Sequence, residues 1–340
     1  MAIYHLSVKT VSRSSGRSAT AAAAYRAGEE IVDERTGLVH DYTRRSGVVS
    51  AELTLPANSP AWAGDRSALW NAAEQSETRK NSTVAREFEI ALPDELTPEQ
   101  RRQLVGTFAK ELADRHGVAV DAAIHLPDRE GDKRNHHAHV LTTTRRLGPE
   151  GFTEKARELD DRKTGPELVS QWRERWGELT NEALERAGSP ARVDHRSLEA
   201  QRAEAVAALD VERADALDRA PEPKLGWAGV ADLRRSERTG EPTRTDKAER
   251  WKDVRADNVE RGSLLQRLRA GALELGAEGV EAFRATAERL RQGLEAFQAK
   301  AQAWLEQQRE QAQVQAKERE AKEQAKQGRG AWWRGPEMER

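Results

Sequence analysis

The segment that most constrains the fold is RNHHAHVLTTTR (residues 134–145), which places three histidines at the head of an apolar run. Successive side chains of a β-strand point to opposite faces of a sheet, so residues two apart share a face. His137 and His139 would therefore project side by side, while His136 would point to the other face. Two imidazoles on one face are costly to crowd together unless a metal ion shares their lone pairs.

A second strand-like segment supplies a third imidazole. The alternation of VAVDAAIHLP (118–127) gives its apolar side chains to one face and Asp121 and His125 to the other. If the two strands are neighbours, His125, His137 and His139 converge and form a site with open positions, as a catalytic metal requires. The chain has no cysteine, so a metal would depend on histidines and carboxylates. This ligand set suits Mn²⁺, Mg²⁺ or another divalent ion and does not select among them.

The segment AREFEIAL repeats this pattern with carboxylates. Its apolar side chains at Phe88 and Ile90 are expected to be buried, which places Glu87 and Glu89 on the opposite face. Carboxylates on a site face can orient a ligand imidazole through its second nitrogen, or accept a proton. An ordinary solvated strand face is the alternative.

Tyr25 is one of only three tyrosines, and it follows four alanines in SVKTVSRSSGRSATAAAAYRAG. A tyrosine in an alanine-rich helix is usually a packing residue. Here small hydroxyls and arginines surround it, and these groups suit a phosphate backbone. A phenol that attacks phosphorus needs a base, a metal or cationic neighbours, because its unperturbed pKa is about 10.

Charge is unevenly distributed in a chain whose formal net charge is −2. Residues 1–28 contain no acid, and residues 129–146 are also rich in cations. Local positive fields of this kind attract phosphates even on a near-neutral protein, although ordinary solvated charge is the alternative. The candidate DNA-binding residues are Lys9, Arg13, Arg17, Arg26, Lys133, Arg134 and Arg145.

The remaining pattern predicts a mixed α/β domain over residues 1–200, with helices covering one face of a sheet. A helix is expected to begin after Thr97, because Pro98 suits its first turn and Gln100 completes a capping box. Further helices are expected at 18–31 and 64–78, strands at 3–9, 84–93, 118–127 and 136–145, and a β-ribbon at 37–55.

The sequence beyond residue 200 changes character. Residues 201–262 read as a helical and linker arm, in which 219–246 are rich in Pro, Gly and Arg. Residues 263–327 predict a long amphipathic helix with apolar residues at 3-4 spacing. That stripe suits either a coiled-coil seam or packing against the body of the protein, and residues 328–340 are expected to be a loose tail.

Several motifs together resemble the MobA/MobL family of plasmid mobilisation relaxases. They are MAIYHLSVKT, AAYRAGE, REFEIALP, AIHLPDREGDKRNHHAHVLTTTR and ERAGSPARVDHRSLEAQ, and they occur in the order found in that family over roughly residues 1–200. The resemblance implies an α+β fold, with a central antiparallel sheet of about five strands, helices on one face and a mostly helical C-terminal region. It also implies that Tyr25 is the nucleophile, that His125, His137 and His139 bind the metal, and that Glu87 and Glu89 are active-site carboxylates.

The function expected from this resemblance is site- and strand-specific nicking and rejoining of DNA at a plasmid transfer origin, through a 5′-phosphotyrosyl intermediate. A rolling-circle replication initiator or a single-strand transposase would share this chemistry. A hydrolase that activates water would leave no tyrosine-linked product, and a non-catalytic DNA-binding scaffold would leave no nick.

The expected partners are single-stranded or supercoiled plasmid DNA, with accessory mobilisation proteins and a type IV secretion coupling protein as further candidates. No run of about 18 apolar residues and no signal-peptide pattern is apparent, so membrane insertion is not expected. The expected location is the bacterial cytoplasm.

Overall fold

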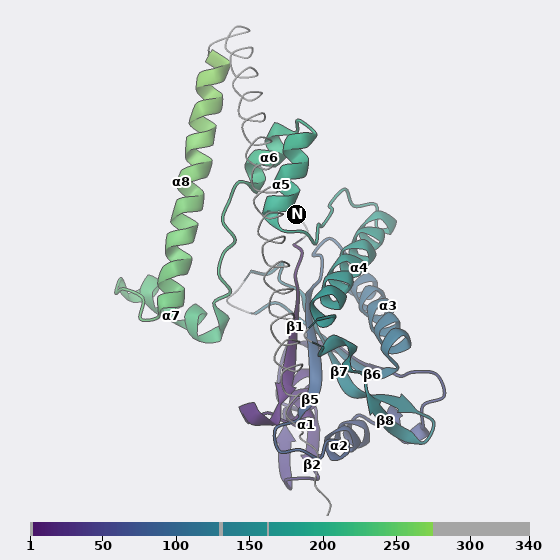
Figure 1. The fold of residues 1–340 in the computed structure, drawn as a ribbon. Helices are drawn as coiled ribbons and strands as arrows, with labels where there is room; N and C mark the ends of the chain where they lie inside the picture. Colours follow the sequence, from purple (N-terminus) through teal and green to yellow (C-terminus); the bar gives the residue numbers. More distant parts are fainter. Residues whose placement is uncertain (1–2, 129–131, 162, 275–340) are drawn as a thin grey trace, which may run out of the picture. The chain divides into compact units, whose positions relative to one another are not determined.

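The computed structural model describes residues 3–128, 132–161 and 163–274 and divides the chain into two compact units, Met1–Glu204 and Ala205–Arg340 (Figure 1). The first unit contains a six-stranded sheet, a two-stranded hairpin and the helices before its boundary. The sheet strands are β1 (Leu6–Ser12), β4 (Val48–Thr54), β5 (Thr83–Ala91), β6 (Val118–His125), β7 (His137–Gly148) and β8 (Gly151–Lys155); the hairpin strands are β2 (Glu30–Asp33) and β3 (Leu38–Asp41). The helices are α1 (Ala19–Ala27), α2 (Arg66–Ser76), α3 (Pro98–His116), α4 (Gly165–Arg186) and α5 (Leu198–Ala207), which crosses the boundary.

The sheet has the order β1-β5-β7-β6-β4, and β8 pairs with β7 outside this path. All of these pairs are antiparallel. The two strands that carry histidines, β6 and β7, are therefore neighbours, and the strand that carries the paired glutamates, β5, lies on the other side of β7. The predicted fold class, an α+β domain on a central antiparallel sheet, is confirmed.

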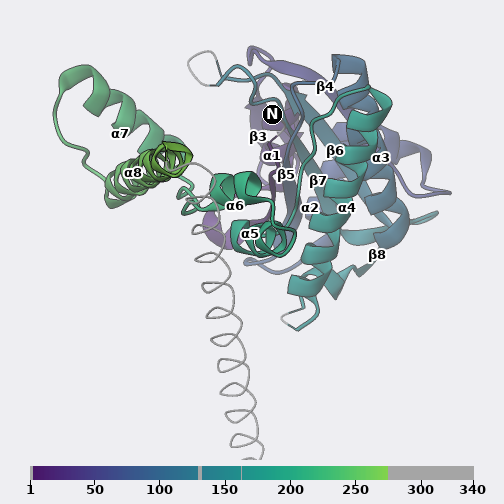
Figure 2. The same cartoon turned by 90° about the horizontal axis from the view of Figure 1, so that it is seen from above.

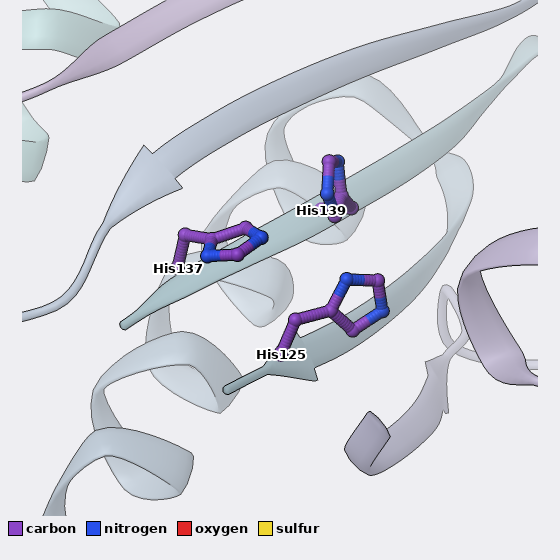
Figure 3. Close-up of side chains that lie close together, drawn as sticks. All are labelled: His125, His137 and His139. Atoms are coloured by element: carbon purple, nitrogen blue, oxygen red, sulfur yellow. The ribbon is translucent and has the colours of Figure 1, made fainter. Parts of the chain in front are cut away.

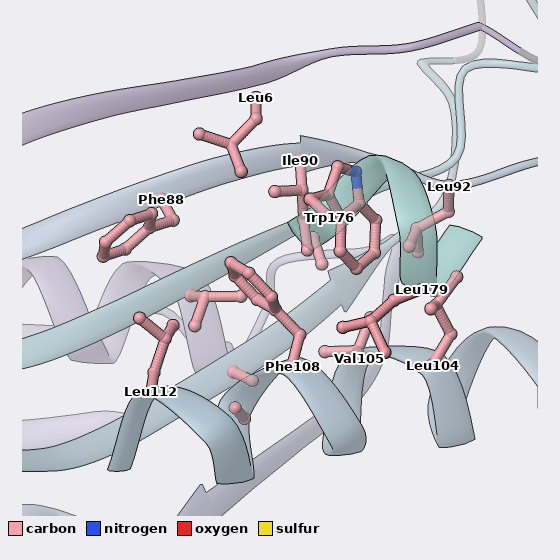
Figure 4. Close-up of a cluster of buried hydrophobic side chains, with 14 of the residues drawn as sticks. Leu6, Phe88, Ile90, Leu92, Leu104, Val105, Phe108, Leu112, Trp176 and Leu179 are labelled. Atoms are coloured by element: carbon pink, nitrogen blue, oxygen red, sulfur yellow. The ribbon is translucent and has the colours of Figure 1, made fainter. Parts of the chain in front are cut away.

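One face of the sheet is covered by α3 and α4, which lie on the same side of it (Figure 2). Phe108 of α3 occupies the centre of this apolar layer. Its ring meets Phe88, Trp172 and Trp176 edge-on, at centroid distances of 6.0, 5.6 and 5.1 Å. Figure 4 shows these layers meeting. Such edge-to-face pairs add to the stabilisation from burying the rings, so this layer fixes the strands from one side.

A second apolar cluster lies on the opposite face of the sheet, at one end. It is formed by alanines of α1, by Trp70 of α2 and by sheet residues such as Val11, Ala85 and Leu141. These sheet residues share their face with the glutamates of β5 and the histidines of β7, because register pairs Val11 with Ala85 and Glu87 with Leu141. The helices α1 and α2 thus cover one end of this face, and Arg26 near the end of α1 contacts both Glu87 and His125.

The helix from Thr97 is confirmed with both halves of its capping box: the Thr97 side chain accepts from the Gln100 backbone, and the Gln100 side chain accepts from the Thr97 backbone. The β-ribbon expected at 37–55 is wrong. Leu38–Asp41 pairs with Glu30–Asp33, whereas Val48–Thr54 pairs with β6 at the edge of the main sheet. The helix expected at 18–31 ends at Ala27, because Gly28 adopts a left-handed conformation with φ 69°.

In the second unit the described helices are α6 (Val211–Leu217), α7 (Gly226–Thr239) and α8 (Asp246–Glu274). The linker expected at 219–246 therefore contains a helix. Asp232 of α7 joins α7 to α8, because its Oδ2 accepts from the backbone N–H groups of Arg244 and Thr245 just before α8 begins. The helix expected at 263–327 coincides with α8 up to Glu274; its remainder and the tail at 328–340 lie outside the described residues.

Candidate metal centre and nucleophile

Strand register brings three histidines together on one face of the sheet. His125 lies directly opposite His137, and Ala123 lies opposite His139, so all three histidines project to the same side. The ring centroids of His125 and His137 are 5.5 Å apart, those of His125 and His139 4.8 Å, and those of His137 and His139 5.3 Å. Figure 3 shows the side chains rising from these neighbouring strands. His136 points to the other face, where its Nε2 lies 3.3 Å from Asp94.

Each ring has one nitrogen committed to a protein acceptor. His125 donates from Nε2 to the Arg26 carbonyl at 2.8 Å, and His137 donates from Nδ1 to the Asn135 carbonyl at 3.0 Å. A carbonyl only accepts, so these ring nitrogens carry the protons. His139 Nδ1 lies 2.5 Å from Glu87 Oε1. Such contacts fix the orientation of a metal-binding imidazole and leave its other nitrogen available.

The nitrogens that remain suit a metal ion. His125 Nδ1 is buried and has no hydrogen-bond partner in the described parts of the chain. A buried polar atom without a partner is rare, and a missing ion is one of its ordinary explanations. One nitrogen from each of the three rings lies within 4.8 Å of the others. The histidines therefore fit a divalent cation.

The electrostatic environment keeps two of these imidazoles neutral, as metal binding requires. Burial lowers the pKa of His125 to about 4, against the raising effect of its hydrogen bond to the Arg26 carbonyl. Burial likewise lowers the pKa of His137. The neighbouring His139 and the cation of Arg45 lower both values further. Near neutral pH these rings therefore carry lone pairs and no charge.

Glu87 is the carboxylate that supports this cluster. It is almost fully buried, at 2% exposure, and it accepts from His139 and, through both oxygens, from Arg26 at 2.8 and 2.7 Å. Burial alone would raise its pKa, but the hydrogen bonds from His139 and Arg26 and their charges hold it well below its usual range. Glu87 is therefore an ionised acceptor that orients His139.

Glu89 has a different environment from Glu87. It lies directly opposite His139 in the β5–β7 ladder and pairs with Lys9 of β1, and its side chain is about one-fifth exposed. Its charge raises the pKa of His137, against the stronger effect of burial. Glu89 thus borders the histidine cluster and binds Lys9, whereas Glu87 makes the hydrogen bond to His139.

The helix that carries Tyr25 is tied to the histidine cluster at its C-terminal end. Ser18 caps the N-terminus of α1, and Gly28 ends the helix. The Arg26 carbonyl that accepts from His125 belongs to the residue that follows Tyr25. Through this contact the structure brings the tyrosine helix to the histidines, although about a hundred residues separate them in the sequence. Tyr25 itself is 44% exposed, so its phenol is open to a substrate.

Most of the predicted DNA-binding cations are paired with acids. The pairs are Lys9 with Glu89, Arg13 with Glu74, Arg26 with Glu87, Arg134 with Asp132 and Arg145 with Glu77. Arg17 and Lys133 are exposed. The local positive field predicted over residues 1–28 is partly offset in the structure, because α2 and β5 bring Glu74, Glu87 and Glu89 to these cations. The acid-free stretch says nothing about acids supplied by other elements.

An open cleft of about 890 Å³ lies beside α1. Tyr25 lines it together with Arg17, Arg35, His40 and Lys80. Small residues of the helix, Ser18, Ala21 and Ala22, also line it. Cations next to an aromatic ring suit a single nucleic-acid strand, in which phosphates alternate with bases that can stack.

The sequence reasoning missed Tyr42 and Arg45. The Tyr42 ring meets the Tyr25 ring edge-on at a centroid distance of 5.2 Å, and the Arg45 guanidinium carbon lies 3.7 Å from the centroid of the Tyr25 ring. The segment TRRSG (43–47) was visible only as a basic turn. No local pattern indicates that this turn folds over the end of α1.

The chain belongs to the MobA/MobL family, whose model matches residues 17–211. It is 50% identical over 223 residues to the mobilization protein MobL of Acidithiobacillus ferridurans, a match that covers 58% of each chain. It is 35% identical to a probable mobilization protein MobA of Bifidobacterium longum, covering 59% of this chain and 41% of that protein. A 43 kDa relaxation protein of Salmonella typhimurium is 36% identical, over 59% of this chain and 55% of that protein. The chain therefore spans less than two-thirds of the length of these relatives.

A solved structure from work on the molecular basis of vancomycin resistance transfer in Staphylococcus aureus is also similar. It is 35% identical, with a TM-score of 0.52, and the match covers 58% of this chain and all of that one. No helix within the described ranges has the length and apolar character needed to cross a membrane.

Proposed function

We propose that this protein is a conjugative relaxase, which nicks and rejoins one DNA strand at a plasmid transfer origin. One observation carries the proposal: an exposed tyrosine lies on a helix whose terminal carbonyl accepts a hydrogen bond from one of three clustered histidines. The names of the relatives, which refer to mobilization and relaxation, support the same activity. We assign the relaxase domain to residues 1–200, and residues 201–262 to an arm.

In the proposed step the Tyr25 oxygen attacks a phosphodiester in line. The new bond joins that oxygen to phosphorus, and the bond from phosphorus to the 3′ oxygen of the preceding nucleotide breaks. The phenol loses its proton to solvent or a nearby base, and the departing 3′ oxygen gains one. The products are a 5′-phosphotyrosyl protein and a free 3′-hydroxyl, and because one ester replaces another, the reverse reaction can rejoin the strand.

His125 Nδ1, with the free ring nitrogens of His137 and His139, would hold a divalent ion, of which Mn²⁺ and Mg²⁺ are the leading candidates. When bound, such an ion neutralises charge on a phosphate oxygen in the transition state. Glu87 keeps the His139 ring in place, and the Arg26 carbonyl does the same for His125. Glu89 borders the cluster, where its negative charge favours a cation.

The DNA-binding surface would include the cleft beside Tyr25 and the exposed Arg17. Cations that are already paired, such as Lys9, Arg13 and Arg26, hold the local structure and add to the field without being free for phosphate. On the other basic segment Lys133 is proposed to contact phosphate, while Arg134 and Arg145, which are paired with Asp132 and Glu77, would add to the field. Plasmid DNA in the bacterial cytoplasm would be the substrate, and accessory mobilisation proteins and a type IV secretion coupling protein would be partners of the assembled complex.

The test is covalent capture of DNA by the full chain. The protein is incubated with labelled oligonucleotides that carry candidate transfer-origin sequences, with and without EDTA, and the products are separated on a denaturing gel. Wild type should form an EDTA-sensitive adduct. Tyr25→Phe should reduce adduct formation by at least about 1000-fold, because it removes the nucleophilic oxygen, while leaving DNA affinity largely unchanged. Tyr42→Phe is the matched control, since it removes a phenol oxygen from the neighbouring ring and should retain the adduct.

Other outcomes would exclude the proposal in specific ways. Normal adduct formation by Tyr25→Phe would remove Tyr25 from the role of nucleophile. A nick without an adduct would indicate a hydrolase that activates water. DNA binding without a nick on any substrate would indicate a scaffold.

A further inference from the structure

The turn that follows the β2–β3 hairpin folds back over the end of α1. The Tyr42 backbone N–H donates to the Glu29 carbonyl at 3.2 Å, and the Arg45 N–H donates to the Tyr42 carbonyl at 2.9 Å. Gly28 permits this approach, because a Cβ at its left-handed position would lie only 3.2 Å from a methyl carbon of Val48. The chain from Tyr42 to Val48 is thus fixed against the last turn of the tyrosine helix.

Arg45 makes two contacts with Tyr25 from this turn. Its guanidinium carbon lies 3.7 Å from the centroid of the Tyr25 ring, and its Nη1 donates to the Tyr25 backbone carbonyl. A guanidinium over an aromatic face is attracted by the ring, and a cation near a helix C-terminus is favoured by the helix dipole. With the Tyr42 ring edge-on to the same ring, Tyr25 is held by two neighbours.

Arg45 and Arg26 differ in how the described part of the protein balances their charges. Arg26, on the same helix as Tyr25, is bound by both oxygens of Glu87. Arg45 is half-buried and forms no ion pair in the parts of the chain that the structure describes. It also lies near the candidate metal centre, because it donates to the Tyr25 carbonyl and the carbonyl of the next residue, Arg26, accepts from His125. A partly buried cation without a carboxylate is favoured when an anion completes its environment.

We propose that Arg45 binds a phosphate of the DNA strand at Tyr25 while holding the Tyr25 ring in position. This inference rests on the proposed function, because it assumes that a phosphodiester lies beside that ring. A guanidinium has five N–H donors in one plane. Stacking uses the face of the group, and the Tyr25 carbonyl uses one donor, so the other in-plane donors can reach phosphate oxygens.

The first experiment compares Arg45→Gln with Arg44→Gln in single-turnover adduct formation on a single-stranded oligonucleotide. Arg44 is the matched control, because it lies in the same turn and is exposed, and its substitution changes the net charge equally. Arg45→Gln should slow the adduct by about 10- to 100-fold and reduce the salt dependence of binding by about one phosphate contact. Arg44→Gln should stay within about threefold of wild type. Arg45→Lys should recover part of the rate, because it keeps the charge and loses the planar donors.

The second experiment removes the phosphate charge in place of the arginine. Oligonucleotides with one neutral methylphosphonate, placed at each position in turn around the nick, are bound to Tyr25→Phe and to the double variant that also carries Arg45→Gln. At one position the methylphosphonate should weaken binding by Tyr25→Phe at least about fivefold and leave the double variant almost unaffected. This cycle isolates the Arg45–phosphate interaction. It measures affinity alone, so its result does not depend on covalent chemistry.

Two results would overturn the inference. The first is equal adduct rates for Arg45→Gln and Arg44→Gln. The second is an equal methylphosphonate effect with and without Arg45 at every position. If wild type forms no adduct, the proposed function fails, whereas a failure confined to the Arg45 variants leaves that function intact. Should Arg45→Gln not fold, Arg45→Met, which keeps the apolar stem and removes the charge, takes its place in both experiments.

Discussion

The two faces of the central sheet have opposite chemical characters although the same strands build both. Along β5, Phe88 and Ile90 are fully buried under α3 and α4, while the intervening Glu87 and Glu89 face the histidine cluster. The first face contributes stability through apolar burial. The second face concentrates three histidines and two carboxylates. Such groups destabilise a fold unless hydrogen-bond partners or ions compensate for the loss of their hydration.

Packing on the apolar face fixes the strand register, and the register in turn positions the histidines on the opposite face. A slip of one residue in the pairing of β6 and β7 would expose Val140 and bury His139. The aromatic layer around Phe108 makes such a slip costly, so it holds His125 opposite His137. The geometry of the candidate site therefore depends on side chains that do not touch it.

The largest expected effect is a loss of stability caused by a substitution on the apolar face. Phe108→Ala should lower the free energy of unfolding by about 3–5 kcal/mol, since Phe108 is fully buried and contacts three other aromatic rings. Urea unfolding monitored by circular dichroism measures this loss. Phe108→Leu retains most of the volume and should cost markedly less. A loss below about 1 kcal/mol for Phe108→Ala would mean that the aromatic layer is not what fixes the sheet.

A smaller effect should come from the carboxylate that orients the cluster. Glu87→Gln should weaken Mn²⁺ binding by about 10- to 100-fold, because the acceptor of His139 loses its charge and Arg26 loses its counterion. Titration calorimetry with Mn²⁺ alone measures the affinity. Glu89→Gln is the matched control and should change the affinity less, since Glu89 is ion-paired with Lys9 at the border of the cluster, whereas Glu87 holds the His139 ring. The reverse ranking would assign the supporting role to Glu89.

The smallest expected effect is a pH dependence of stability, which His116 on the apolar side of the sheet should cause. His116 accepts from the Trp172 indole at 3.0 Å and lies 2.9 Å from Glu158, and burial lowers its pKa from the ordinary 6.5 despite that carboxylate. A lowered pKa means that the unfolded chain binds more protons than the folded one below about pH 6.5. The contribution of His116 to stability is therefore present above that pH and is lost as pH falls.

Urea midpoints at pH 7.5 and pH 5.5, with EDTA present, measure this dependence. Wild type should lose more stability on acidification than His116→Gln, because the variant cannot take up that proton. An identical loss in both proteins would show that His116 does not contribute to the pH dependence.

Local sequence pattern was sufficient for the strands that form the site. Alternation in β5, β6 and β7 assigned Glu87, His125 and His139 to the correct faces, since strand geometry depends only on the nearest neighbours. The pattern did not give the pairing of β3, which joins β2 and not β4. The predicted helix at 18–31 included the first two residues of β2, because the left-handed conformation of Gly28 that ends the helix is not apparent in a charged, helix-favouring sequence.

The ion pairs could not be predicted from the sequence either, because their partners lie far apart along the chain. Arg13 and Arg26 stand in a stretch without acids, yet each is bound by a glutamate more than sixty residues away. Arg45 shows the same limit in another way. The sequence presents it as one cation of a basic turn, and only the structure shows that it lies over the Tyr25 ring. The partner of a charged side chain depends on which strands and helices pack together. The residues next to it in the sequence do not indicate that packing.

By itself, the sequence determined which side chains share a face and where the firmest helix begins, because alternation, capping and turn chemistry act over a few residues. Only the tertiary structure decided that the tyrosine helix ends against the histidines, that Glu87 rather than Glu89 supports His139, and that Arg45 covers Tyr25. These outcomes depend on strand order and on a loop folding over a helix end, and long-range packing alone sets both.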